Sequence, residues 1–267
     1  MTHIEWHAPG SFCWFELATT DQNAAKKFYQ SLFGWGVNDT PMGPDEIYTI
    51  FTVDGRDCAA GYTMRKEQRS MGIPPNWLLY IAVANVDLAA SKAATAGGTL
   101  LMAPFDVMDL GRMAVVQDPT GATFALWQAK KSQGTRIVNE NFTVCWADLN
   151  TPDVPRASKF YSDVFGWKLA GGKDMSPAGP NDYAHIVNGT EFIGGVPPAS
   201  MKDPNAPPHW MIYVEVPDCA ATVAKAKSLG AKVYVDTMSI QESGSMAVLA
   251  DPQGAVFALH TAAKKNA

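Results

Sequence analysis

DQNAAKKFYQSLFGW, residues 21–35, is the stretch of the chain that decides the fold. Its apolar side chains recur at helical spacing, which predicts a helix with one apolar face. Asp21 stands where a side chain can accept hydrogen bonds from the free N–H groups at a helix start, and Gly34 stands where a helix commonly ends. The same pattern returns as DVPRASKFYSDVFGW, residues 153–167. We therefore predict the same helix twice, and with it the same domain twice.

Two further motifs recur in the same order as the helix. PPNW at residues 74–77 returns as PPHW at 207–210, and DPTGA at 118–122 returns as DPQGA at 251–255. The offset between the copies is 132 residues for the helix motif and 133 residues for the other two. Three motifs held in one order at a nearly constant offset indicate a duplicated domain.

The domain boundaries are predicted from where the repeated pattern stops. The domains run over residues 8–129 and 139–263, joined by the polar stretch 130–134. Each half opens with a short alternating strand, at residues 12–19 and 142–150, before its first helix. After the double proline each half starts again with a strand, an alanine-rich helix and further strands. Each half therefore contains two similar units, and the chain contains four.

Composition narrows the possible partners. Of 267 residues, 47% are hydrophobic and 18% are charged, which is typical of a globular chain. The net charge of −5 argues against nucleic acid as a partner, because phosphate binding needs a clustered positive excess. No apolar run is long enough to cross a membrane, the N-terminus has no secretory pattern, and the four cysteines are widely scattered. We expect a cytoplasmic protein with a small-molecule partner, and the sequence leaves its oligomeric state open.

The repeated motifs resemble those of the vicinal oxygen chelate superfamily, which includes glyoxalase I, extradiol dioxygenases, fosfomycin-resistance enzymes and bleomycin-binding proteins. The resemblance rests on the helix with its Phe-Tyr and Phe-Gly-Trp pairs and on the Asp-Pro-x-Gly turn before the last strand. It covers nearly the whole chain twice, and is closest to the tandem glyoxalase-like proteins of bacteria. It implies an α+β fold of two tandem domains, each of two βαβββ units that form a half-open barrel around a cavity.

The resemblance also implies positions at which His, Gln or Glu would hold a divalent metal ion. Each domain should supply ligands from its first strand, its fifth strand and its last strand. Those positions hold Trp14, Leu78 and Ala125 in the first half, and Trp146, Met211 and Ala258 in the second. None of these side chains is a ligand for a hard metal ion. We therefore expect no metal at the family's positions and assign no cofactor.

An acid recurs on the face of the first strand that should line the cavity. Alternation along the strand places Glu16 and Asp148 beside a tryptophan in each half. Burial in such a cavity raises the pKa of a carboxyl group, so either acid could accept a proton or anchor a ligand. The alternative is a structural carboxylate that bonds to the backbone or to a tyrosine. Cys13 and Cys145, next to the tryptophans, are expected to face the helices.

The remaining candidates lie on the fifth and last strands. His260 is a third candidate for proton transfer, and its occurrence only in the second half suggests that function maps to residues 139–263. The expected ligand-contacting residues are Trp14, Tyr80, Trp127, Trp146, His209, Met211 and Tyr213.

Three functions remain open at this point. The chain could bind a flat aromatic or apolar molecule between tryptophan and tyrosine side chains. It could be a metal-independent enzyme of glyoxalase-like or hydroxylase-like type that uses Glu16, Asp148 or His260 in proton transfer. It could also be a non-catalytic protein whose cavities are filled by its own side chains.

Overall fold

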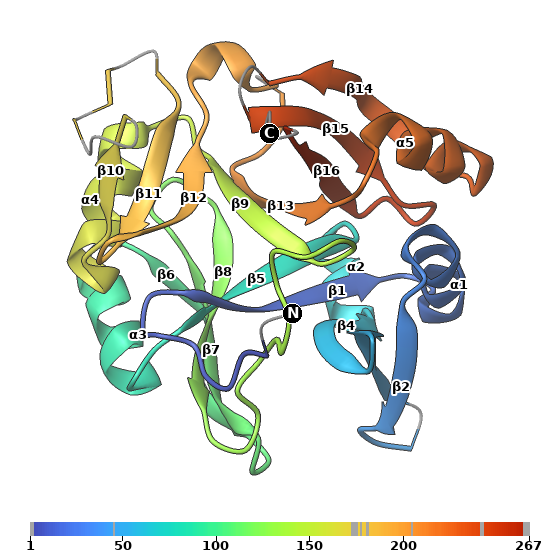
Figure 1. Ribbon diagram of the computed structural model, residues 1–267. Coiled ribbons are helices and arrows are strands. Elements are labelled where there is room, and N and C mark those ends of the chain that lie inside the picture. Colours follow the sequence, from blue (N-terminus) through green and yellow to red (C-terminus); the bar gives the residue numbers. More distant parts are fainter. Residues whose placement is uncertain are drawn as a thin grey trace.

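The computed structural model describes residues 3–263 apart from 45, 172–175, 177, 180–181, 204 and 241–242. Two mixed sheets dominate it, one from each half of the chain (Figure 1). The first sheet contains, in spatial order, β2 (Gly36–Pro41), β3 (Ile47–Val53), β4 (Arg56–Thr63), β1 (Phe12–Thr19), β5 (Asn76–Ala82), β8 (Thr123–Ala129), β7 (Gly111–Gln117) and β6 (Thr99–Val107). The second sheet contains, in the equivalent order, β10 (Lys168–Ala170), β11 (Ala184–Asn188), β12 (Glu191–Val196), β9 (Val144–Asn150), β13 (His209–Glu215), β16 (Val256–Ala262), β15 (Gly244–Ala250) and β14 (Lys232–Ser239).

Strand pairing confirms that each half is made of two βαβββ units. In the first half β1 runs parallel to β4 and β5 runs parallel to β8, while β1 and β5 meet antiparallel at the centre. The second half repeats this arrangement through β9, β12, β13 and β16. The helices are α1 (Gln22–Phe33), α2 (Lys66–Ser70), α3 (Val86–Thr95), α4 (Val154–Phe165) and α5 (Cys219–Ser228), with a short 3₁₀ helix η1 at Ala199–Met201.

The repeated helix begins and ends where the sequence predicts. The side chain of Asp21 accepts a hydrogen bond from the backbone N–H of Ala24 at 2.9 Å, and Asp153 caps α4 in the same way. Gly34 follows α1 with a φ of 76°, and Gly166 follows α4 with a φ of 75°. These left-handed conformations are the reason that both helices end on glycine.

The repeated aromatic motif joins the two halves. The Tyr29 hydroxyl donates a hydrogen bond to Asp251 of the second half at 3.0 Å, and the Tyr161 hydroxyl donates to Asp118 of the first half at 2.9 Å. Both acceptors are the aspartates of the Asp-Pro-x-Gly turns. A single apolar core, with residues from both sheets, fills the space between the halves. Helices α3 and α4 pack together at one side of this core, and α1 and α5 lie together at the other (Figure 1).

Each first strand contains an irregularity at its cysteine. The register of β1 against β5 shifts between Phe12 and Trp14, and the register of β9 against β13 shifts at Cys145. A bulge of this kind turns two consecutive side chains to the same face of a sheet. Cys13 accordingly packs with Tyr80 on the concave face, so our expectation that it faces the helices is wrong.

Candidate functional site

Two tyrosines surround the acid at the centre of the first concave face. Glu16 accepts a hydrogen bond from the Tyr48 hydroxyl at 2.6 Å and another from the Tyr80 hydroxyl at 2.9 Å. Trp14 in turn donates its indole N–H to the oxygen of Tyr48 at 2.9 Å. Burial raises the pKa of Glu16, and the two phenol donors act in the opposite direction because they stabilise the charged form.

The second concave face repeats this arrangement with a shorter acid. Asp148 accepts hydrogen bonds from the hydroxyl groups of Tyr183, at 2.5 Å, and Tyr213, at 2.8 Å. The indole N–H of Trp146 contacts both Asp148, at 3.1 Å, and Tyr183, at 2.7 Å. Burial raises the pKa of Asp148, opposed by these three donors and by the charge of Lys202. The carboxyl group is thus removed from water, with only 3% of the residue exposed, but supplied with donors.

The structure therefore brings together six of the residues that the sequence nominated as site residues. Glu16 meets Trp14 and Tyr80 in the first half, and Asp148 meets Trp146 and Tyr213 in the second. The second tyrosine of each cluster was not predicted from the sequence. Tyr48 and Tyr183 recur at equivalent points of the two copies, and this recurrence is the signal that could have identified them.

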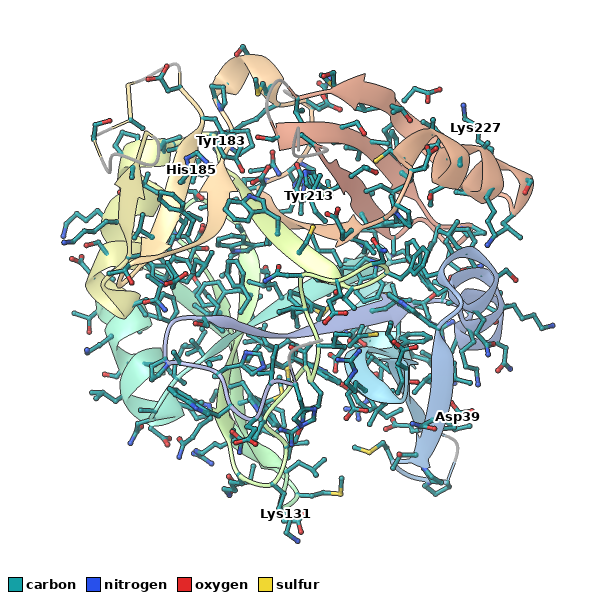
Figure 2. The ribbon with its side chains drawn as sticks, in the orientation of Figure 1. Asp39, Lys131, Tyr183, His185, Tyr213 and Lys227 are labelled. Atoms are coloured by element: carbon teal, nitrogen blue, oxygen red, sulfur yellow. The ribbon has the colours of Figure 1, made fainter. Side chains whose placement is uncertain are left out.

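Neighbouring residues hold Tyr183 in place. Its ring packs against His185 with centroids 5.2 Å apart. Tyr183 directly precedes β11 and His185 lies on it, across the face from Tyr213 on β13 (Figure 2). Gly195, which pairs with Asp148 across β12 and β9, lies under the phenol. A Cβ at Gly195 would lie 1.9 Å from the Tyr183 oxygen, so only glycine leaves room for this contact.

The first concave face is partly covered by its own side chains. Trp127 is only 9% exposed and packs with Tyr80 at a centroid distance of 6.4 Å, while its indole N–H donates to the Ser132 carbonyl at 3.0 Å. Met113 and Val115 complete this apolar cluster, and Leu78 packs against it. Trp127 therefore fills the first face, whereas the equivalent residue of the second half is a histidine.

The two candidate histidines lie at opposite ends of the second face. His209 pairs with Asn150 at the start of β13, and its Nδ1 contacts the Pro207 carbonyl at 2.7 Å. His260 pairs with Glu215 at the far end of β13, with 2.6 Å between His260 Nδ1 and Glu215 Oε2. The carboxylate beside His260 is therefore Glu215 and not Asp148, because the register of β16 places His260 beyond the aspartate cluster.

The positions at which the family holds its metal ion lie together on the second face. Trp146 and Ala258 both pair with Tyr213, and Met211 pairs with Asp148, so the three expected positions lie on adjacent strands of the second face. Their side chains are an indole, a methyl group and a thioether, and the first half offers no better set. The residues at these positions do not fit a divalent metal ion of the kind bound by nitrogen and oxygen ligands.

The duplicated fold agrees with the comparison to known families. The family model of the Glyoxalase/Bleomycin resistance protein/Dioxygenase superfamily matches residues 11–126 and again residues 131–259. The chain therefore belongs to this superfamily, with two copies of its domain. None of the helices in the described residues is long and apolar enough to cross a membrane.

Two individual proteins are similar to this chain over nearly its whole length. The chain is 41% identical over 247 residues to the "Putative glyoxylase CFP32" of Mycobacterium tuberculosis, with 92% of each chain covered. It is 34% identical over 269 residues to the "Anthracycline biosynthesis protein DauV" of Streptomyces sp. strain C5, with 94% of this chain and 93% of the relative covered.

Solved structures show the same fold at low sequence identity. The Mn(II)-bound glyoxalase from Novosphingobium aromaticivorans matches with a TM-score of 0.65 and 13% identity, covering 95% of this chain and 82% of the other. Homoprotocatechuate 2,3-dioxygenase from Brevibacterium fuscum matches with a TM-score of 0.63 and 14% identity, covering 98% of this chain and 84% of the other.

Proposed function

We propose that this protein binds a flat aromatic or otherwise planar small molecule on the concave face of its second half. The observation that carries the proposal is the cluster around Asp148, a buried carboxyl group held by two phenols and an indole. Tyrosine and tryptophan provide large apolar surfaces with few rotatable bonds, which suits the binding of planar ligands. The hydrogen-bonded carboxyl group would give such a ligand a fixed polar contact.

The second half is favoured because its face is less filled. In the first half Trp127 and Met113 cover the sheet beside Glu16, whereas His260 replaces the tryptophan in the second half. Lys202 adds a positive charge near Asp148, and its ammonium group donates to the Thr151 carbonyl at 2.7 Å. A ligand with a hydroxyl or carbonyl group on a planar ring system would match this combination of groups.

The name of one relative supports a planar ligand. The Streptomyces relative is named for anthracycline biosynthesis, and anthracyclines are flat polycyclic aromatic compounds. The hydroxyl of Tyr213 donates to Asp148 at 2.8 Å and keeps a lone pair that can accept a hydrogen bond from a phenolic ligand. Aromatic contact and one polar anchor are together sufficient for selective binding of such a molecule.

The second candidate function is acid–base catalysis by Asp148 without a metal ion at the family's positions. It is favoured by the 2.5 Å contact between Tyr183 and Asp148 and by the raised pKa of the aspartate, because a carboxyl group with a raised pKa is better suited to accept a proton and return it. Conversion of a bound hydroxyquinone by wild-type protein, lost in Asp148→Asn with binding retained, would support catalysis over simple binding.

The binding proposal is tested with a hydroxyanthraquinone titrated into the protein while tryptophan fluorescence is recorded. Trp146→Ala and Tyr213→Phe should each weaken binding, the latter by about tenfold, which corresponds to the roughly 1.4 kcal/mol of one buried hydrogen bond. Trp14→Ala and Tyr80→Phe are the matched controls from the first half and should leave the affinity unchanged.

Two results would contradict the proposal. If the variants of both halves lose the same amount of affinity for the hydroxyanthraquinone, binding is not specific to the second half. If no planar aromatic compound changes the tryptophan fluorescence, the result would favour a protein whose cavities are filled by its own side chains.

A further inference from the structure

A cluster of three potential metal ligands lies outside the positions that the superfamily uses. Cys145 on β9, Glu215 on β13 and His260 on β16 each point a donor atom at one region, and these atoms all lie within 4.8 Å of one another. The three strands are neighbours in the sheet, and Glu215 and His260 are paired directly across β13 and β16. Cys145 reaches them because the irregularity in β9 turns it away from the helices.

The backbone already orients two of the three ligands. His260 presents Nδ1 to Glu215 Oε2 at 2.6 Å, while its Nε2 lies 3.1 Å from the Ser243 carbonyl. Glu215 accepts the N–H of Ala262 on its other oxygen, Oε1, at 3.0 Å. Metal-binding histidines and carboxylates are commonly held in this way, with the outer atom bonded to the protein and the inner atom left for the ion.

Comparison of the two halves shows that the fold does not require this cluster. The equivalent positions of the first half hold Cys13, Ala82 and Trp127, which pack together in an apolar group. The duplicated domain therefore keeps the cysteine in both copies and combines it with a carboxylate and an imidazole in one copy only. If the three side chains only stabilised the sheet, the apolar residues found in the first half would do so equally well.

We propose that Cys145, Glu215 and His260 form a binding site for a divalent transition-metal ion of the zinc class. Thiolate, imidazole and carboxylate are the three kinds of ligand that Zn²⁺ takes in proteins, and the mixed set excludes the hard ions Mg²⁺ and Ca²⁺. On binding, a metal–sulfur bond replaces the S–H bond of Cys145 and the proton passes to solvent, as does any proton on His260 Nδ1. Three protein ligands leave a fourth position for water or a small molecule.

The experiment is a titration of chelator-treated protein with Co²⁺, followed by competition with Zn²⁺. We expect one equivalent of Co²⁺ to produce the near-ultraviolet charge-transfer absorption of a cobalt–thiolate bond, and Zn²⁺ to remove it. Cys145→Ser should abolish this absorption, and Glu215→Gln and His260→Gln should each weaken metal binding by at least about 100-fold, more than is usual for loss of an outer partner. Circular dichroism of each variant confirms that it is folded.

The controls distinguish this site from adventitious binding. His209→Gln removes another histidine of the same face, and Cys219→Ser removes a nearby thiol, so both variants should retain the absorption and the affinity of the wild type. The proposal is overturned if no stoichiometric binding is seen, or if binding survives in Cys145→Ser and His260→Gln alike. An ion pair between Glu215 and His260 with no metal would then be the whole role of the cluster. When hydroxyanthraquinone binding at Asp148 is measured on chelator-treated, metal-free protein, either proposal can fail without the other.

Discussion

At the scale of single residues, the concave faces are defined by two carboxyl groups under opposing influences. Removal from water favours the neutral acid, while hydrogen bonds from phenols favour the carboxylate. Burial is the larger influence at both Glu16 and Asp148, so the pKa of each is raised. Each acid should therefore hold its proton to a higher pH in the folded protein than in the unfolded chain.

Because the pKa of Glu16 is higher in the folded protein than in the unfolded chain, its contribution to the free energy of unfolding should depend on pH. Because the folded protein binds the proton more tightly, the free energy of unfolding falls as pH rises from the usual glutamate pKa of 4.5 to the raised value, and then levels off. Glu16→Gln has no such proton to lose. Urea denaturation at several pH values should show the variant gaining stability relative to the wild type as the pH rises above 4.5. A difference that is constant, or that changes in the wild type's favour, would mean that the tyrosine hydrogen bonds outweigh burial.

A second residue-scale prediction concerns Gly195. An added methyl group would meet the Tyr183 oxygen at 1.9 Å and force the phenol away from Asp148. Gly195→Ala should therefore lower the free energy of unfolding by about 1–3 kcal/mol, as is usual when a packed site is overfilled. The matched control is Gly61→Ala on β4, where the nearest atom would lie 3.2 Å away and belongs to a Phe51 ring. If thermal denaturation gives equal losses for the two variants, the close approach to Tyr183 is not the cause.

At the scale of elements, local patterns could be predicted and contacts between strands could not. The helices α1 and α4 follow from apolar spacing, a capping aspartate and a terminal glycine, all of which lie within one stretch of chain. Tyr48 reaches Glu16 from a strand far along the sequence, and alternation assigns faces but not which strands curl over a face. The expectation for Cys13 was wrong because one extra residue in β1 shifts the alternation, and no local residue type marks such a bulge.

The capping aspartate supplies the prediction at this scale. Asp153 accepts the N–H of Arg156 at 3.0 Å, so Asp153→Ala leaves that donor unsatisfied and should cost about 1 kcal/mol of unfolding free energy. Asp163→Ala removes an acid from the exposed side of the same helix, where it pairs with Lys159 at 2.7 Å. That exposed pair should contribute less than about 0.5 kcal/mol. Chemical denaturation of the two variants measures the loss in the free energy of unfolding of each. If both variants lose the same amount, the effect comes from the charge on the helix and not from the cap.

At the scale of the whole molecule, the motifs that reveal the duplication also connect the two copies. Trp35 donates its indole N–H to the Phe142 carbonyl of the second half at 2.7 Å, and Trp167 donates to the Gly10 carbonyl of the first half at 3.0 Å. The apolar spacing of the Phe-Tyr and Phe-Gly-Trp pairs predicts that these side chains are packed in the core between helix and sheet. The sequence could not show that the same side chains face the other half, because a motif that packs on its own sheet and one that packs between sheets have the same apolar spacing.

The shared core predicts that the two halves unfold together. Tyr161 is the strongest test, because its hydroxyl donates to Asp118 of the first half and accepts the indole N–H of Trp210 at 3.0 Å. Tyr161→Phe leaves both buried partners unsatisfied and should lower the free energy of unfolding by about 1–3 kcal/mol. Tyr29→Phe should cost a similar amount, since Asp251 and Trp77 flank Tyr29 in the same way.

In the wild type and in both of these variants, urea denaturation followed by tryptophan fluorescence and by far-ultraviolet circular dichroism should give one coincident transition. Tyr234→Phe, on the exposed strand β14, is the control and should change the free energy by less than about 0.5 kcal/mol. The interface does not couple the halves if the two probes separate in the wild type, or if Tyr161→Phe shifts only one of two resolved transitions. Coincident transitions that move together would show that each concave face depends for its stability on the half of the chain that does not contain it.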